Sequence, residues 1–333
     1  MKQNSASKAE IFFSIIIPVK IQNDYTRRAI PFYKKQSFRS FEIMLVTDQK
    51  EEICGFENLD VRCLASGSCG PAAKRDLAAR EARGKILCFI DDDAWPEGNW
   101  LSCAHEIFQK NEAAAGGPAV TPPQSEFLRQ GSGLVFESIT GGGGLSFRYR
   151  PWRNRFYVDD YPSVNLFVRR DLFLQAGGFN TAYWPGEDTV LCLELKKAGH
   201  RVLYVPELLV YHERRRLFFP HAAQVFSYGM HRGFFVKKFP ETSARPLFFL
   251  PLLLCAGLVL GWAPGFLWNP LFYFWAGGAA ALACLIYCEM FFRSKKLFLS
   301  FIASAGVFLT HFSYSAGLIR GLTSRRLKSR LRA

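Results

Sequence analysis

The first 215 residues alternate between short apolar runs and longer segments with helical periodicity. Runs rich in β-branched and other apolar residues, each of strand length, occur at 12–19, 41–48 and 86–90. Between them, Pro31 interrupts mixed helical periodicity over 24–38, and an Ala- and Arg-rich helix pattern over 71–84 ends at Gly84, the usual position of a C-terminal cap. This alternation predicts an α/β fold, a mostly parallel sheet flanked by helices.

The last third of the chain has a different pattern, with long apolar segments bounded by basic residues. Apolar runs near 247–263 and 271–292, uncharged over 247–263 and 271–288, each have about the length needed to cross a bilayer, and Trp262, Trp268 and Trp275 cluster near their connection. Because the connection carries no Lys or Arg whereas 293–296 reads RSKK, both ends of this hairpin are expected in the cytoplasm. The alternative is that these segments form the apolar core of a soluble helical domain.

A third apolar stretch, about 297–319, carries a weakly polar stripe and is followed by a basic tail. From Arg293 to the end there are nine Lys or Arg and no acid. A third span would place the tail outside, against the charge rule, so a helix in the cytoplasmic interface is favoured over a third span. A mixed aromatic and cationic segment before the first span, 224–240, fits an in-plane connector or a packed helix.

Acidic residues gather where the predicted strands end. Asp91, Asp92 and Asp93 follow the run 86–90, and Pro18 and Asp48 end the two earlier strands. Ligands of parallel α/β sheets bind beyond the carboxyl ends of the strands. A divalent metal bound to a diphosphate, Mg²⁺ or Mn²⁺, would account for three adjacent carboxylates, although aspartates are also common in solvated turns.

A second acidic pair, Glu187 and Asp188, opens a predicted helix over 187–197 that closes at Gly199. Carboxylates in a first helical turn are stabilised by the exposed N–H groups, which is a sufficient structural reason for them. A carboxylate held ionised in this way can also act as a general base toward an acceptor hydroxyl.

Five blocks in order resemble the membrane-attached bacterial family 2 glycosyltransferases, which have the GT-A fold. They read SIIIPV, GPAAKRD, ILCFIDDDAWPEGNWL, SVNLFVRRDLFLQAGGFN and GEDTVLCLELKKAGHRVLYVPELLVYH, and the resemblance covers about residues 10–235. It implies an inverting transfer of hexosyl type from a nucleotide sugar, UDP- or GDP-linked, with Mg²⁺ or Mn²⁺. Charge on the leaving diphosphate would be neutralised by the metal and nearby cations.

The resemblance also implies roles for single residues. Asp91 and Asp93 match the outer positions of the DxD motif, facing the sugar nucleotide and the metal, with Asp92 between them. Asp188 matches the catalytic base of the xED motif, preceded by Glu187. The remaining matches are Pro18 and Val19 lining the nucleotide, Asp48 reading the base, Arg75 near the nucleotide, and His212 approaching the metal. The family's usual Asn after the Arg is Asp76 here, which loosens that local match.

The predicted domains are a catalytic domain over 1–220, a juxtamembrane connector over 221–245 and a membrane region over 246–333. The processive QxxRW motif is missing after the xED block, where the chain reads HERRR, so transfer of a single sugar is expected. The expected acceptor is a membrane-bound, polyprenyl-linked saccharide in cell-surface glycan assembly. Arg148–Arg155 and Arg214–Arg216 could meet its phosphates, and TGGGGLSF could be a mobile acceptor-side loop.

Two other functions remain open: a polyprenyl-phosphate monosaccharide synthase, and a catalytically silent membrane scaffold. The expected location is the bacterial inner membrane with the catalytic domain on the cytoplasmic side, and membrane lipids are expected partners. The polar start MKQNSASKAE is unlike a secretory signal, and nine scattered cysteines without CxxC pairs indicate reduced thiols. The formal net charge is +14, and the basic residues flank the apolar spans. This placement disfavours nucleic acid as a partner. The sequence does not predict the oligomeric state.

Overall fold

The computed structural model describes residues 10–179 and 183–327. The ends of the chain, 1–9 and 328–333, including part of the basic tail, lie outside the described residues. The described residues divide into two compact units, one made of 10–119 with 151–179 and 183–211, the other of 120–150 with 212–327.

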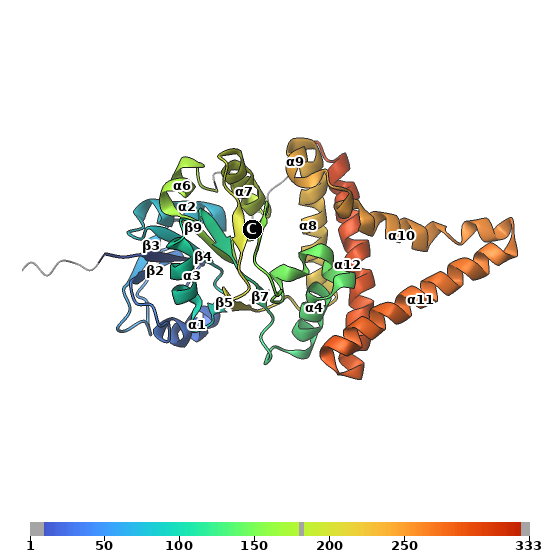
Figure 1. Cartoon of the computed structure of the whole chain (residues 1–333), viewed down its shortest axis with the longest axis horizontal. Coiled ribbons are helices and arrows are strands. Elements are labelled where there is room, and N and C mark those ends of the chain that lie inside the picture. Colours follow the sequence, from blue (N-terminus) through green and yellow to red (C-terminus); the bar gives the residue numbers. More distant parts are fainter. Residues whose placement is uncertain (1–9, 180–182, 328–333) are drawn as a thin grey trace, which may run out of the picture. The chain divides into compact units, whose positions relative to one another are not determined.

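The first unit is built on an eight-stranded sheet with the order β3-β2-β1-β4-β9-β6-β10-β8 (Figure 1). Its strands are mostly parallel, and the antiparallel pairs are β4–β9, β6–β9 and β8–β10. The strands are β1 (Phe13–Pro18), β2 (Phe41–Thr47), β3 (Val61–Ala65), β4 (Ile86–Ile90), β6 (Ala114–Gly116), β8 (Phe156–Val158), β9 (Asn165–Arg169) and β10 (Val202–Tyr204).

Helices cover the faces of this sheet and bury its apolar strands. They are α1 (Asp24–Lys34), α2 (Pro71–Glu81), α3 (Trp100–Phe108), α6 (Arg170–Gln175) and α7 (Glu187–Lys197). Every residue of β1, β2 and β4 is buried, as expected for central parallel strands. A small second sheet has the order β5-β11-β7, formed by β5 (Ala94–Pro96), β11 (Val210–His212) and β7 (Ala119–Val120).

The predicted helix over 71–84 is three residues too long. Helix α2 ends at Glu81, and its cap Ala82 has extended backbone angles. Gly84 is therefore not a C-terminal cap: it lies so close to β1 that a Cβ placed on it would be 2.5 Å from Ser14 N. Pro31 also does not stop its helix, because α1 continues through it to Lys34.

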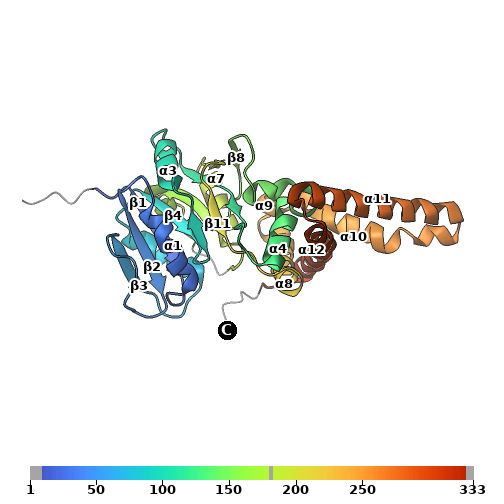
Figure 2. The ribbon, with the colours of Figure 1, turned by 90° about the horizontal axis from the view of Figure 1, so that it is seen from below.

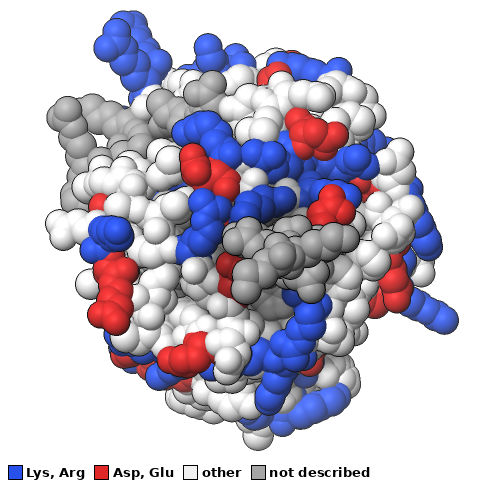
Figure 3. Space-filling view, turned by 90° about the vertical axis from the view of Figure 1, so that its left-hand side faces the viewer, with Lys and Arg blue, Asp and Glu red and all other residues white. Residues whose placement is uncertain are grey.

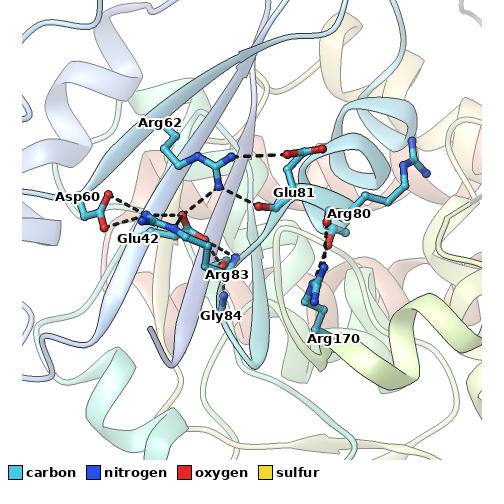
Figure 4. A network of polar contacts seen from close by, with 10 residues as sticks. Glu42, Asp60, Arg62, Arg80, Glu81, Arg83, Gly84 and Arg170 are labelled. Atoms are coloured by element: carbon cyan, nitrogen blue, oxygen red, sulfur yellow. Dashed lines mark hydrogen bonds and ion pairs between the residues drawn. The ribbon is translucent and has the colours of Figure 1, made fainter. Parts of the chain in front are cut away.

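A buried carboxylate near the amino ends of β1 and β2 ties the sheet to the segment after α2 (Figure 4). Glu42 of β2 has no exposed surface, and it accepts hydrogen bonds from Ser14 Oγ at 2.6 Å and from Arg83 Nε at 2.7 Å. These bonds and the Arg83 charge outweigh desolvation and lower the pKa of Glu42. Because each acceptor oxygen has charged or hydroxyl donors, this network is structural.

The second unit is helical, and three of its segments are long and apolar enough to cross a membrane. These candidate spans are Pro246–Phe266, Asn269–Ser294 and Leu297–Thr323. The helices are α4 (Phe127–Glu137), α5 (Ile139–Gly142), η1 (Gly143–Arg148), α8 (Phe219–Lys238), α9 (Pro240–Ser243), η2 (Pro246–Phe249), α10 (Leu250–Leu260), η3 (Ala263–Phe266), α11 (Asn269–Ser294) and α12 (Leu297–Thr323).

The three candidate spans differ in how much of their surface the protein covers. In each of the first two spans, only 6% of the most apolar window is buried inside the protein. In α12, 44% of the corresponding window is buried. Figures 1 and 2 show α10 and α11 as a hairpin, while α12 lies beside α8 and α4. The first two spans therefore present the apolar surface expected of lipid-facing helices.

Basic residues outnumber acidic ones in the chain, 42 against 28. On the face drawn in Figure 3, Lys and Arg side chains are interspersed with Asp and Glu. This mixed pattern differs from the continuous basic stripe of a typical nucleic-acid interface.

Candidate active site

The three aspartates follow β4 directly, at the carboxyl end of a central strand. Strand β4 is fully buried, and the side chain of Asp91 is 32% exposed, so the chain passes from the core to the surface within one residue. In a sheet of this topology that edge is where ligands bind. The strand-end position predicted for Asp91–Asp93 is thus observed.

Arg75 joins the two acidic blocks of the sequence. Its guanidinium, carried by α2, donates through Nη2 to Asp91 Oδ1 at 2.6 Å and through Nη1 to Glu187 Oε1 at 3.3 Å. The Arg75 side chain is 4% exposed and also lies over the Phe179 ring, 5.5 Å from its centroid. Burial disfavours this cation, but Asp91, Glu187 and Asp188 outweigh burial and raise the pKa of Arg75.

Glu187 and Asp188, the first two residues of helix α7, are buried carboxylates. Within the described part of the chain, Glu187 Oε2 and Asp188 Oδ1 are buried and accept no hydrogen bond. Burial raises the pKa of both groups, and the neighbouring carboxylate charges raise it further, while Arg75 opposes the shift. The Ser163 hydroxyl and backbone also donate to Asp188 and favour its ionised form. Buried hydrogen-bond acceptors without donors are costly to the fold. Where they occur together with perturbed pKa values, they are typical of a ligand-binding site.

Asp48, predicted to read the base, is held by a lysine that sequence reasoning did not single out. Lys74 of α2 donates to Asp48 Oδ1 and to the carbonyl oxygen of Val19. The Lys74 side chain is 4% exposed and that of Asp48 is 26% exposed. The ends of β1, where Pro18 pairs with Val46, and of β2 are thus tied together. The signal that could have found Lys74 is its place beside Arg75, in a helix that begins at this edge.

Asp92 is directed to a different partner from its neighbours. Asn23, the N-cap of α1, donates through Nδ2 to Asp92 Oδ2 at 2.5 Å. Burial and the charge of Asp93 raise the pKa of Asp92 to about 6, against the effect of Asn23. Asp92 therefore links the aspartate run to the helix that follows β1.

Asp91, Asp93 and His212 could hold a metal ion, because one ligand atom of each lies within 4.8 Å of the others. Asp91 and Asp93 follow β4, and His212 is the last residue of β11, the strand in which the boundary between the two units falls. Two carboxylates and an imidazole form a donor set that divalent cations accept. Arg214 Nη1 lies 2.9 Å from His212 Nδ1, which fixes the ring orientation.

Asp76 replaces the Asn that the family pattern would place after Arg75. Its Oδ1 accepts a hydrogen bond from the backbone N–H of Phe179 at 2.8 Å, and a Cβ on Gly178 would lie 2.6 Å from the same atom. Asp76 thus holds the segment that carries Phe179, whose ring lies against Arg75.

The comparisons with known proteins agree with this architecture. Residues 14–173 match the family model for glycosyl transferase family 2. A pre-mycofactocin glycosyltransferase of Mycobacterium tuberculosis is 25% identical over 258 residues, a match that covers 75% of this chain and 51% of that protein. A glucosyl-dolichyl phosphate glucuronosyltransferase of Haloferax volcanii is 23% identical over 201 residues, which is 54% of this chain and 61% of that protein. This chain thus spans about half to three fifths of the length of these relatives.

A solved structure shares the fold over most of the chain. The mannosyltransferase PcManGT from Pyrobaculum calidifontis, in complex with GDP-Man and Mn²⁺, aligns with a TM-score of 0.52 at 16% identity. The alignment covers 94% of this chain and 88% of that one. At this identity the likeness concerns the fold alone. The family match shows a glycosyl transferase family 2 domain over 14–173, and together with the glycosyltransferase relatives it supports a family 2 glycosyltransferase with a GT-A fold and candidate membrane helices.

Proposed function

We propose that this enzyme moves a single sugar, by an inverting transfer, from a nucleotide sugar to a lipid-linked acceptor at a membrane. The observation that carries the proposal is the convergence of Asp91 and Glu187 on Arg75, with acceptor oxygens of Glu187 and Asp188 that have no donor among the described residues. A site that joins a cation to several carboxylates at a strand end suits a phosphate-bearing sugar donor.

The donor would lie along the ends of β1, β2 and β4. Asp48 would accept hydrogen bonds from the base, next to Pro18 and Val19, and the carboxylates of Asp91 and Asp92 would face the ribose and sugar. Arg75 supplies a positive charge beside Asp91 that favours a developing diphosphate. The base, UDP- or GDP-linked, and the sugar, expected to be a hexose, are part of the proposal.

Asp91, Asp93 and His212 would hold the metal, Mg²⁺ or Mn²⁺. When bound, the ion would neutralise charge on the leaving nucleoside diphosphate. Arg75 keeps Asp91 oriented through the bond at 2.6 Å, and Arg214 orients His212.

The acceptor hydroxyl would lose its proton to Asp188, with Glu187 beside it as the second carboxylate. A general base works best when its pKa lies near the working pH, and burial raises the pKa of Asp188 in that direction. Ser163 holds the Asp188 side chain and leaves Oδ1 without a donor among the described residues. The attacking oxygen would approach the anomeric carbon from the face opposite the diphosphate.

The candidate spans support an acceptor that is itself in the membrane. Two of them bury only 6% of their most apolar window, so the chain is suited to lipid contact. The name of the Haloferax volcanii relative includes a sugar on a dolichyl phosphate, which favours a saccharide-bearing polyprenyl acceptor for this chain too. The proposed location is the bacterial inner membrane, with the site on the cytoplasmic side.

The test uses the full chain in detergent with Mn²⁺, a panel of UDP- and GDP-sugars and a membrane lipid extract. Asp188→Asn is expected to lower kcat for transfer by about 10²–10⁴-fold, the range for loss of a general base. Asp171→Asn, the same substitution at an exposed acid of α6, is the matched control and should act like wild type. Mass spectrometry of the lipid fraction would identify the product.

Two outcomes would contradict the proposal. If wild type and Asp188→Asn show equal background rates with every donor, a silent scaffold is favoured. If a bare polyprenyl phosphate is glycosylated and a lipid-linked saccharide is not, the chain is a polyprenyl-phosphate monosaccharide synthase.

A further inference from the structure

One short segment of the second unit bonds to two of the three candidate spans and lies near the start of the first. It consists of residues 139–148, which form α5 and η1 and include four consecutive glycines, Gly141–Gly144. Thr140 bonds to Glu289 of α11 and to His311 of α12. A Cβ placed on Gly144 would lie 3.6 Å from Leu247 Cδ2, at the start of the first span. We call residues 139–144 the glycine segment.

Glu289 is the acidic residue of α11, and its side chain is 18% exposed. It accepts hydrogen bonds from the backbone N–H of Ile139 at 2.7 Å, the N–H of Thr140 at 2.9 Å and Thr140 Oγ1 at 2.7 Å. Arg293, one turn further along α11, donates through Nη2 at 2.8 Å. Acidic residues in membrane helices are rare and costly, so this carboxylate needs a compensating role.

His311 completes the attachment from the third span. Its Nε2 lies 2.7 Å from the carbonyl oxygen of Thr140, so Nε2 carries the hydrogen and donates. Thr140 is therefore held through its N–H, its hydroxyl and its carbonyl, by side chains of two different helices. Buried polar networks whose members are all satisfied fix one backbone position.

Of the four glycines, the first two are tightly packed and the third, Gly143, is open. A Cβ on Gly141 or Gly142 would lie 2.4 Å or 2.0 Å from the carbonyl oxygen of Val135 or Phe136, so both approach α4 closely. Gly143 has a φ of +57° and nothing within 4 Å of such a Cβ. Among the described residues the backbone at Gly143 is thus open, which suits close approach of a ligand.

We infer that Glu289 is a positioning residue that holds the glycine segment so that its open backbone meets the head group of the lipid-linked acceptor. The inference rests on the proposed function. In this inference Glu289 helps to position the acceptor, whereas residues of the first unit bind the donor.

The test compares Glu289→Gln, Thr140→Ala and the double variant with wild type, in the full chain reconstituted with acceptor lipid. Glu241→Gln, at an exposed position of α9, is the matched control. Glu289→Gln is expected to raise KM for the acceptor about tenfold or more, because bonds to a charged group are lost. KM for the donor and hydrolysis of the donor by water should stay unchanged. The double variant should have the same acceptor KM as Glu289→Gln, because both substitutions break the same Thr140–Glu289 contact.

Hydrogen exchange of the glycine segment provides a readout independent of activity. Faster exchange of residues 139–144 in Glu289→Gln, with unchanged exchange in β4, supports the inference. Unchanged exchange overturns it, as does an equal loss of acceptor transfer and donor hydrolysis, which indicates a general structural defect. If wild type transfers no sugar from any donor, the proposed function fails and the acceptor role fails with it, whereas exchange still decides whether Glu289 holds the segment.

Discussion

Asp188 has a chemical arrangement that is unfavourable for stability and suited to proton transfer. Its carboxylate is buried near Glu187 and Asp91, and Oδ1 has no donor within the described ranges. A raised pKa means that the folded state binds a proton more readily than the unfolded state. Between the ordinary aspartate value and the raised one, stability therefore falls as pH rises, and above both values the loss is complete.

Asp188→Asn should therefore stabilise the fold while it slows transfer. The variant removes a buried charge that repels its neighbours, so Tm is expected to rise at pH 8 by a few degrees, about what 1 kcal/mol gives in a protein of this size. At pH 5, where the wild-type group is largely protonated, the gain should shrink. Thermal unfolding in detergent at both pH values measures this. A lower Tm for Asp188→Asn at pH 8 would contradict the argument.

Lys74 offers a second prediction at the residue scale, because its ammonium satisfies two oxygens at once. Lys74→Met leaves Asp48 and the Val19 carbonyl without their donor, and unfolding free energy should fall by about 1–3 kcal/mol. With Asp48 released, KM for the donor should rise more than kcat falls. Lys85→Met, at a lysine whose side chain is 57% exposed, is the control. Equal donor KM in wild type and Lys74→Met would show that Asp48 needs no such support.

The sequence located the acidic blocks of this site but not their partners. Strand ends can be read from apolar runs that stop at aspartates, so Asp48 and Asp91–Asp93 could be placed at one edge. The choice of Arg75 as the shared partner of Asp91 and Glu187 depends on how α2 and α7 pack, which no local pattern contains. Asn23 was missed for the same reason, because its bond to Asp92 spans 69 residues.

At the scale of elements, the prediction from the sequence missed a helix in which glycines allow close packing. Helix α4, over Phe127–Glu137, was not predicted, since Gly131 and Gly133 lower helix propensity. In the structure Gly133 allows close approach, because a Cβ on it would lie 2.0 Å from Thr121 Oγ1, and a Cβ on Gly131 would make a tight contact 3.1 Å from Leu217 Cδ2. Tertiary contact thus outweighs propensity in α4. The long apolar helices, in contrast, were predictable because composition alone marks them.

Helices α8 and α12 pack through glycines that bring their backbones together. A Cβ on Gly229 or Gly233 of α8 would lie 2.2 Å from the carbonyl oxygen of Tyr314 or Leu318 of α12. One on Gly317 would lie 2.1 Å from the Phe226 carbonyl oxygen of α8. The contacts advance together along both helices, so the two run parallel. Small residues at such spacing allow close helix pairs in or near membranes.

Gly317→Leu should separate α8 from α12. A leucine cannot fit against backbone atoms, so the cost is expected near the upper end for overpacking, about 3 kcal/mol, with a lower Tm in detergent. Gly277→Leu in α11 is the matched control, because a Cβ there has nothing within 4 Å. The control should leave Tm close to that of wild type. An equal effect of the two substitutions would mean that the α8–α12 contact contributes little.

At the scale of the whole molecule, the open question is on which side of the membrane the chain ends. If α12 spanned the bilayer, its parallel partner α8 would be drawn in beside it, along with His231, Arg232 and Lys237. Lys237 donates to the carbonyl oxygens of Leu322 and Ser324, so the charged end of α8 stays with the end of α12. Charged side chains are costly inside a bilayer, which favours α12 lying on the catalytic side.

We therefore predict two crossings, by Pro246–Phe266 and Asn269–Ser294, with both ends of this hairpin on the same side as the catalytic unit. A fluorescent protein fused after the last residue should then fluoresce in the cytoplasm, and alkaline phosphatase fused there should be inactive. The same phosphatase inserted at Leu267, between the two crossings, should be active, and an insertion at exposed Lys35 serves as the cytoplasmic control. An active phosphatase at the C-terminus would mean that α12 crosses the bilayer. In that case the α8–α12 pairing could not persist in the membrane, because it would carry Arg232 and Lys237 into the apolar layer.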